Sequence, residues 1–300
     1  MVWADPLTDG PVPGNVPDEE LLRVRAGFLA ASPDDVADVA ADLAGWRAAV
    51  VDTARFDELV LWFEHDLFDQ LNLIQLLSHL AGQLRTRPIS LVCVGTFPGH
   101  PQFKGLGELS PPDLAALFET RRPITEAQLQ LATGAWRAFR SNTPRDLETL
   151  LGSDTSALPF LARALRRHLE EFPSDRDGLS RTERTLLQQA TDGPVDLQRA
   201  LPRMHEHEDA FYVTDTSLSD LARSLAASSP ALIELSLDPA DERSLPKGTF
   251  ALTAAGREIL VGAADRVRRC GIDRWLGGVH LVGKGPMWRW SDATGGLVER

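Results

Sequence analysis

The chain has 300 residues, of which 43% are hydrophobic and 25% charged, and its net charge at pH 7 is −12. These fractions are typical of a folded protein and exclude a disordered chain, and the length is sufficient for two domains. Most of the negative charge lies in residues 1–177, and because it repels phosphate backbones, DNA is not expected as a partner.

The sequence carries no signal of a membrane or secreted protein. No window approaches about 18 consecutive apolar residues, and Met1–Pro6 lacks the basic and apolar parts of a signal peptide. Cys93 and Cys270 lie far apart, and apolar residues flank Cys93. We therefore expect two free thiols, a cytoplasmic location and no membrane association.

The first third of the chain alternates between strand and helix patterns. Residues 2–4 are a short apolar stretch that we interpret as the end of a strand, and a loop rich in Pro and Gly follows. A helix is predicted to begin at Pro17, with acidic residues in its first turn, and a second helix is predicted over residues 34–51.

Two buried strands and a long helix are predicted in residues 58–94. Residues 58–63 and 89–94 are continuous apolar runs, and leucines recur between them at helical spacing. Continuous apolar strands separated by helices are typical of a parallel sheet covered on both faces. We therefore predict a Rossmann-like α/β domain with a mostly parallel sheet over residues 1–125.

The middle of the chain is predicted to be helical. Residues 126–172 contain several helix starts and form a helical connector in our interpretation. The pattern breaks at the polar, Pro- and Gly-containing stretch 172–178, so a domain boundary is placed at residue 173.

The C-terminal part shows the element order of a winged helix. Ser180 and Glu183 form a capping box at the start of the first of three predicted helices. Two strands, over residues 230–235 and 249–252, and a further helix come next. We predict a winged-helix-like α+β domain over residues 173–300, ending in a β-hairpin that turns at residues 283–285.

The third predicted helix of this domain has the position of a DNA-recognition helix in a winged helix, but it lacks the positive charge needed to bind DNA. Residues 215–227 offer Asp215, Asp220 and a single Arg223, whereas a recognition helix normally presents Arg, Lys, Asn or Gln to the groove. We expect this domain to contact protein instead.

Four stretches together resemble a known bacterial family of uncharacterised proteins, the domain of unknown function eighteen thirty-five with its C-terminal companion domain. The resemblance covers nearly the whole chain and lies in Trp3–Pro11, Trp62–Gln70, Arg166–Pro173 and Gly271–His280. It implies no particular activity. It also implies a further strand and helix with an Asn-Gly-Asp stretch ahead of Met1, so we expect either that the start site is misassigned or that this first β-α unit is missing here.

One group of polar residues follows the predicted strand ends. In an open α/β sheet, ligands bind at the carboxyl ends of strands, where this sequence concentrates carboxylates and an imidazole. The candidate ligand-binding residues are Asp5, Asp9, Glu64, His65, Asp66, Asp69 and Gln70.

Carboxylates with an imidazole suit either a divalent metal or acid–base chemistry. Asp5, Glu64 and Asp66 are the candidate metal ligands, and Glu64, His65 and Asp69 are the candidate catalytic residues. The alternative is helix capping, with Asp66 as N-cap and Asp69 in the first turn. Capping accounts for those two residues but leaves Glu64 and His65 unexplained.

Other polar stretches carry weaker signals. The tract His205–Asp209 has its histidines two residues apart, which do not share a helix face, so we interpret it as a solvated helix end. The run Arg266–Arg269, together with Arg274, could bind a phosphate-bearing ligand or nucleic acid, but we favour pairing of these arginines with Asp265 and Asp273.

Two function classes remain open. The first is a ligand-binding or regulatory interaction protein, with a small-molecule ligand or a protein partner. The second is a metal-dependent enzyme that uses the acidic strand-end cluster, with a divalent metal as cofactor, on a phosphate-bearing or nucleotide substrate.

Overall fold

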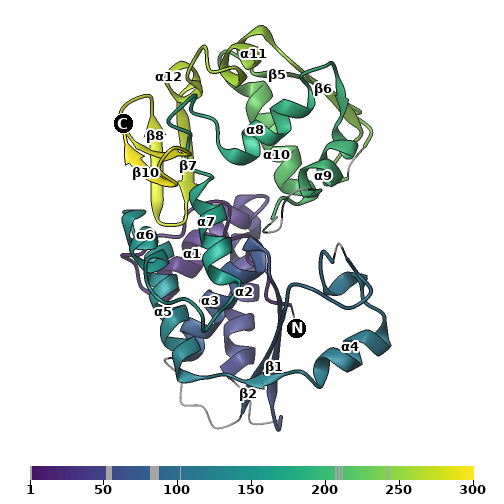
Figure 1. Ribbon diagram of the computed structural model, residues 1–300, viewed down its shortest axis with the longest axis vertical. Helices are drawn as coiled ribbons and strands as arrows, with labels where there is room; N and C mark the ends of the chain where they lie inside the picture. The colour runs from purple at the N-terminus through teal and green to yellow at the C-terminus, as the bar shows by residue number, and fades with distance from the viewer. Residues whose placement is uncertain are drawn as a thin grey trace. The chain divides into compact units, whose positions relative to one another are not determined.

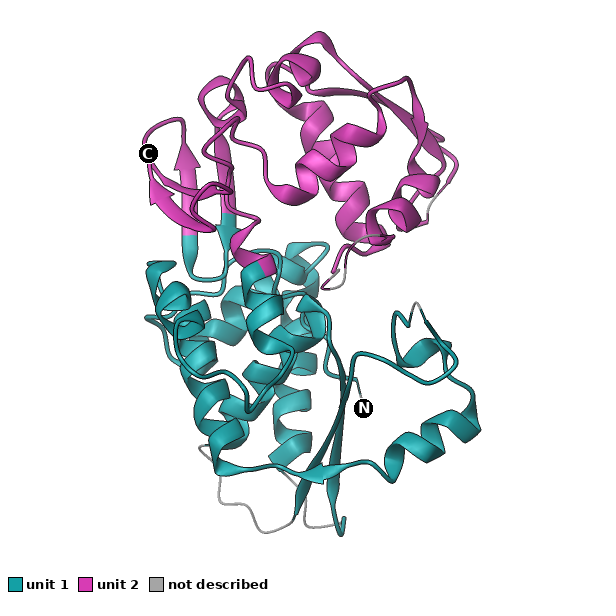
Figure 2. Ribbon diagram, in the orientation of Figure 1, with its two compact units in different colours: residues 1–166, 275–279 teal, residues 167–274, 280–300 magenta. Residues whose placement is uncertain are grey.

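The computed structural model, shown in Figure 1, describes residues 2–51, 56–81, 88–101, 103–206, 208, 210, 212–241 and 243–300. The chain divides into two compact units (Figure 2). Unit 1 comprises Met1–Arg166 and Trp275–Val279, and unit 2 comprises Arg167–Arg274 and His280–Arg300. This division differs from the predicted boundaries after residues 125 and 172.

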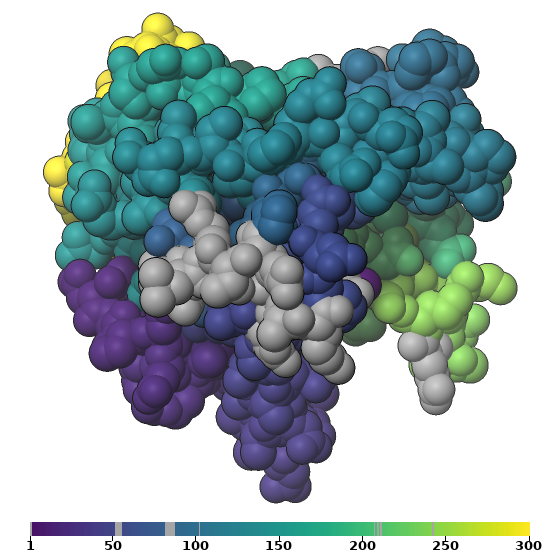
Figure 3. All heavy atoms as spheres, turned by 90° about the horizontal axis from the view of Figure 1, so that it is seen from below, coloured from purple at the N-terminus to yellow at the C-terminus, as the bar shows by residue number. Residues whose placement is uncertain are grey.

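Unit 1 is mixed α/β. Its first two helices, α1 and α2, pack against each other and form adjoining purple areas in the space-filling view of Figure 3. The helices of unit 1 are α1 (Asp18–Leu29), α2 (Val36–Val51), α3 (Leu67–Ala81), α4 (Pro111–Phe118), α5 (Glu126–Phe139) and α6 (Arg145–Leu151), with 3-10 turns η1 (Pro33–Asp35) and η2 (Leu106–Glu108). Helix α7 (Leu161–Leu169) runs across the division between the units.

A three-stranded sheet lies at the centre of unit 1. Strands β1 (Leu59–Glu64) and β2 (Ile89–Val94) pair in parallel, and Glu64 stands opposite Val94 at their carboxyl ends. Strand β3 (Arg122–Pro123) adds an antiparallel edge beside β2. The prediction of an α/β unit with a parallel pair of strands is therefore confirmed.

Apolar side chains cover both faces of this sheet. Helix α3 buries the predicted leucine face almost completely, with Leu73, Ile74 and Leu77 inaccessible to solvent, and it also packs along α5. On the opposite face, Val92 packs with Phe103, Leu109 and other apolar residues of the segment before α4 and of α4 itself. The sequence pattern of this region and its burial therefore agree.

The predicted strand at residues 2–4 is wrong, since these residues form no strand. The backbone of Asp5 finds its partners on a side chain instead. Asp5 N donates to Asn72 Oδ1 at 3.0 Å, and Asn72 Nδ2 donates to Asp5 O at 2.9 Å. The Asn72 side chain of α3 thus provides the hydrogen bonds that a neighbouring strand would have made with this part of the backbone.

The first helix that lies wholly within unit 2, α8, is capped as predicted: the Ser180 side chain and Glu183 form a capping box at its start. Strand β6 lies between β4 and β5 in a three-stranded sheet, and both neighbours run antiparallel to it. The elements are α8 (Arg181–Gln189), β4 (Val195–Asp196), α9 (Leu197–His205), α10 (Asp215–Ala227), β5 (Ile233–Leu237), β6 (Gly248–Leu252), α11 (Ala254–Leu260) and α12 (Arg266–Cys270).

The C-terminal strands form two separate pairs. Strand β7 (Ile272–Leu276) pairs with β8 (Val279–Gly283), and β9 (Trp288–Ser291) pairs with β10 (Gly296–Glu299). The predicted turn at residues 283–285 is wrong, because the first pair turns at Gly277–Gly278. The tip is held by tertiary contacts that the sequence does not reveal: Val12 N donates to Gly277 O, and Gly278 N donates to Phe139 O, both at 3.0 Å.

Both glycines at this tip are required by their surroundings. Gly277 has φ +60°, and a Cβ atom on it would collide with the Phe139 carbonyl. A Cβ atom on Gly278 would collide with the Arg140 carbonyl. The last turn of α5 and the β7–β8 tip therefore fit together closely within unit 1.

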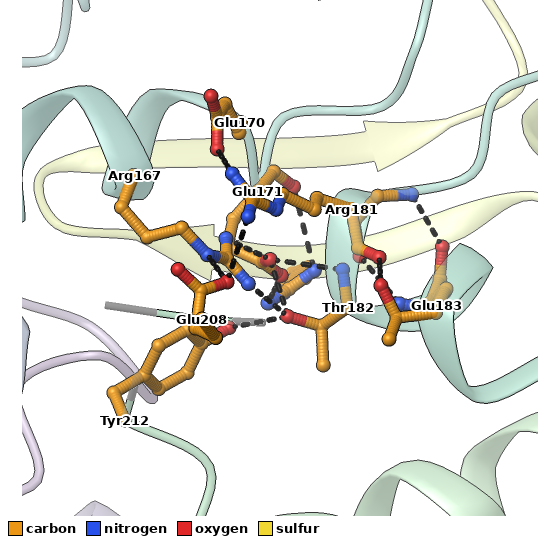
Figure 4. A network of polar contacts seen from close by, with 11 residues as sticks. Arg167, Glu170, Glu171, Arg181, Thr182, Glu183, Glu208 and Tyr212 are labelled. Atoms are coloured by element: carbon orange, nitrogen blue, oxygen red, sulfur yellow. Dashed lines mark hydrogen bonds and ion pairs between the residues drawn. The ribbon is translucent and has the colours of Figure 1, made fainter. Parts of the chain in front are cut away.

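Unit 2 contains a buried network of polar side chains, shown in Figure 4. Both oxygens of Glu171 accept from arginines, Oε1 from Arg167 Nη1 at 2.7 Å and Oε2 from Arg274 Nη2 at 2.9 Å. The Thr182 hydroxyl also contacts Glu171 and lies 3.0 Å from the Tyr212 hydroxyl. Burial opposes ionisation of Glu171, but the arginines outweigh it and hold its pKa far below the ordinary value.

Among the helices in the described residues, none combines the length and apolar character needed to cross a membrane. Cys93 and Cys270 are both free thiols. Burial raises the pKa of the Cys93 thiol to about 12, so it is not a nucleophile at neutral pH.

Candidate metal centre

Three acidic side chains meet where β1 gives way to α3. Strand β1 ends at Glu64 and α3 begins at Leu67, so Asp66 lies in the turn and Asp69 in the first helical turn. Glu64, Asp66 and Asp69 each offer a carboxylate oxygen, and these three oxygens lie within 4.8 Å of one another. This separation allows a single ion to contact all three.

Backbone N–H groups hold each of these carboxylates in place. Asp66 Oδ1 accepts from Asp69 N at 2.9 Å, and Asp69 Oδ2 accepts from Glu64 N at 2.5 Å. Glu64 Oε1 accepts from Leu106 N at 2.7 Å. Because a carboxylate has about four lone-pair positions, each group keeps capacity for a further ligand. Capping and ion binding are therefore compatible at this site.

The loop before η2 lies directly on the Glu64 carboxylate. A Cβ atom on Gly105 would collide with Glu64 Oε2, so a larger residue here would push the carboxylate aside. The chain thus contributes one wall of the site from Gly105, which lies 41 positions after the end of β1.

Burial and mutual repulsion make the three carboxyl groups harder to ionise than in water. Burial raises the pKa of Asp66 to about 7, and the neighbouring charge of Asp69 adds to the effect. Burial likewise raises the pKa of Glu64 and of Asp69. No Lys or Arg of the described residues forms an ion pair with any of the three. A bound cation would supply the missing positive charge.

His65 lies beside this cluster and is 9% exposed. Its ring meets the ring of Phe160 edge-on at 6.0 Å, and a hydrogen bond connects it to the Val94 backbone. Burial lowers its pKa, and the charges of Arg163 and Lys104 lower it further. Both effects favour the neutral form of the imidazole.

The other candidate residues have different partners. The Asp5 carboxylate forms a buried ion pair with Arg25, with Oδ1 2.5 Å from Nη2, and lies outside the group of three. Asp9 contributes its carbonyl oxygen to the same guanidinium at 2.7 Å, and its carboxylate accepts from the Thr8 hydroxyl. Gln70 Nε2 donates to the Glu64 carbonyl at 2.6 Å, so it positions the strand end.

Two residues that matter here escaped the sequence reasoning. Arg25 is 1% exposed and also donates to the carbonyls of Pro6 and Asp9, so it organises the whole N-terminal loop. Asn72 is fully buried and binds Asp5. Only the placement of a polar residue within an otherwise apolar helical face could have indicated Asn72.

The weaker stretches also have structural partners. His205 Nε2 lies 2.9 Å from Val213 O, while His207 and Asp209 of the same tract are outside the described residues. The predicted pairing of the arginines with Asp265 and Asp273 is wrong. Their ion-pair partners are more distant in sequence: Glu183 for Arg266, Glu258 for Arg269 and Glu171 for Arg274.

In comparisons with protein-family models, with curated proteins and with solved structures, no match to this chain was found. What the protein does must therefore be inferred from its own geometry.

Proposed function

We propose that this protein binds a divalent cation through Glu64, Asp66 and Asp69, and that the cation takes part in binding a small ligand. The observation that carries the proposal is the approach of three carboxylate oxygens to within 4.8 Å of one another. Oxygen-only donors favour Mg²⁺, Mn²⁺ or Ca²⁺, and three carboxylates leave coordination positions for water or a ligand.

The test is calorimetric titration of the full chain with Mg²⁺, Mn²⁺ and Ca²⁺ separately. Asp69→Asn removes one charge from the cluster and should weaken the preferred cation at least about tenfold, the effect of losing one charged ligand. Asp113→Asn is the matched control, because Asp113 also lies in a first helical turn and accepts from a backbone N–H.

If Asp113→Asn weakens the cation as much as Asp69→Asn does, the cluster has no special role. If none of the three cations binds at millimolar concentration, the proposal fails.

A second candidate is metal-dependent phosphoester chemistry, and the surroundings of His65 favour it. The imidazole lies beside the cluster, and burial together with the charges of Arg163 and Lys104 lowers its pKa and favours its neutral form. A neutral imidazole suits a general base, and nearby cations suit a phosphate group. Hydrolysis of p-nitrophenyl phosphate with the preferred cation tests this candidate, with loss of activity expected in His65→Gln.

For unit 2 we propose a winged-helix-like arrangement that contacts protein. The order α8, β4, α9, α10, β5, β6 and the sheet order β4–β6–β5 support it. The charge on α10, with Asp215 and Asp220 against Arg223, argues against DNA. Duplex binding at about 50 mM salt in a fluorescence anisotropy assay, abolished by Arg223→Ala, would contradict this proposal.

For unit 1 a Rossmann-like relationship and membership of the domain of unknown function eighteen thirty-five family stay proposals. The β1–α3–β2 unit with parallel strands supports the first. The four resembling stretches of sequence support the second.

A further inference from the structure

A second polar site lies at the other end of α3 from the acidic cluster. A groove of about 730 Å³ runs between α5, α6 and the loop at residues 14–15, and Ser78 of α3 lines it. Helices α5 and α6 lie side by side in unit 1 (Figure 1). The volume is within the range of small-molecule sites, about 300–1,000 Å³.

Arg140 forms a rigid part of this groove. Its Nε donates to Pro13 O and its Nη2 to Val16 O, both at 3.0 Å, and only 11% of its side chain is exposed. A Cβ atom on Gly14 would collide with the Arg140 carbonyl, so the loop packs directly on the end of α5. The wall formed by this loop is therefore built before any ligand arrives.

Arg137 lies one turn earlier on α5 and also lines the groove. Its side chain is exposed, and it forms no hydrogen bond or ion pair with any of the described residues. A guanidinium that lines a groove without an internal partner has all five N–H donors available to an anion.

The rest of the lining suits hydroxyl groups. Thr133, Ser141 and Thr149 contribute hydroxyls, Asn15 contributes an amide, and Asp146 contributes a carboxylate that can accept from a ligand hydroxyl. Trp136 adds an apolar surface beneath Arg140, whose guanidinium carbon lies 5.5 Å from the ring centre.

Positive charge accumulates behind the groove although the protein as a whole is acidic. Burial lowers the pKa of Arg140 and of Arg47, and the two cations disfavour each other. Asp18, 3.7 Å from Arg140 and mostly exposed, is a nearby counter-charge for both, and Asp5 is a second one for Arg47. An anion entering the groove would relieve this excess.

We propose that this groove binds a small phosphate ester that also carries hydroxyl groups, either a sugar phosphate or a nucleoside monophosphate. The Arg137 guanidinium meets the phosphate, and the hydroxyl, amide and carboxylate groups meet the sugar. Ser78 lies nine positions after Asp69 on α3, about 14 Å along the helix axis, so this site is distinct from the acidic cluster.

The experiment is calorimetric titration of the full chain, in metal-free buffer, with glucose 6-phosphate, AMP, inorganic phosphate and glucose. Arg137→Gln should weaken the preferred ester at least about tenfold, the loss expected for a charged hydrogen bond. Arg199→Gln is the matched control, since Arg199 is an exposed helical arginine of unit 2. Thermal unfolding of both variants confirms that they are folded.

A preference for glucose 6-phosphate or for AMP identifies which of the two sources supplies the ligand. The proposal is overturned if neither ester binds at concentrations up to about 5 mM, because a site built for a small molecule should have a Kd below that. It is also overturned if Arg137→Gln and Arg199→Gln bind alike, or if inorganic phosphate alone binds as tightly as the esters. Because metal is absent, failure of the cation site leaves this result unchanged.

Discussion

The Asp66 carboxyl should make the stability of the metal-free protein fall as the pH rises. Burial and the charge of Asp69 raise its pKa in the folded state from 3.8 to about 7. The folded state therefore keeps a proton that the unfolded state releases. The stability from this group is complete below about pH 4, and is lost as the pH rises through about 7.

The expected size of this effect follows from the pKa. At about 1.4 kcal/mol for each pH unit, the change from 3.8 to about 7 corresponds to at most about 4 kcal/mol. Because the Asp66 carboxyl is coupled to Glu64 and Asp69, the three groups titrate together. Part of the loss of stability therefore occurs at the pH values where Glu64 and Asp69 titrate. Asp66→Asn keeps the N-cap acceptor and removes the ionisation.

The measurement is urea unfolding of wild type and Asp66→Asn at pH 5 and pH 8 with a chelator present. Because part of the loss has already occurred at pH 5, the wild type should lose about 2–3 kcal/mol more than the variant between these two pH values. Adding the preferred cation at about 100 times its Kd should restore about 2.7 kcal/mol to the wild type at pH 8. Parallel pH dependence of the two proteins, within about 0.5 kcal/mol, would refute the reasoning.

Three further substitutions test the fold. Leu77→Ala should cost about 2–5 kcal/mol in urea unfolding, because Leu77 is fully buried, and a cost below about 0.5 kcal/mol would show that α3 does not cover the sheet. Glu171→Gln leaves the buried Arg167 and the half-buried Arg274 without their shared carboxylate and should cost about 3–5 kcal/mol, whereas little change would show that the network is open to water. Gly278→Ala should lower the stability by at least about 1 kcal/mol through its collision with the Arg140 carbonyl, whereas Gly285→Ala, with open space around it, should not.

The sequence predicted those elements of the fold that a hydrophobic pattern within a short segment specifies. The apolar runs that became β1 and β2 and the leucine face of α3 are periodic signals, and burial followed them. The turn at Gly277–Gly278 was missed because Gly283 and Gly285 give an equally good local signal. The choice between them depends on the carbonyls of α5, which no nearby residue reveals.

The candidate site was predictable for a similar reason. Glu64, Asp66 and Asp69 lie within six positions, and a strand-to-helix turn brings such residues together. Asp5 lies 59 positions before Glu64, and no sequence pattern marks its partner Arg25. The sequence therefore did not predict the buried ion pair between Asp5 and Arg25. Local spacing predicts a cluster well, but not a partner supplied by another element.

The stretches that resemble a known family also supply much of the internal framework. Arg167 and Glu171 belong to one of these stretches and Arg274 to another, and the three meet in the buried network of unit 2. Gly277 and Gly278 close the β7–β8 turn. These motifs therefore have a structural role, and their presence alone does not indicate catalysis.

The β7–β8 tip also constrains the order in which the protein can mature during synthesis. Unit 1 contains residues 275–279, so its packing around Val12, Phe139 and Arg140 is complete only when nearly the whole chain has left the ribosome. Until then the carbonyls at the end of α5 face water, and residues 1–166 form an unfinished body. A fragment that stops at residue 166 would stay in that state permanently, and cutting this protein between its units does not yield two complete folds.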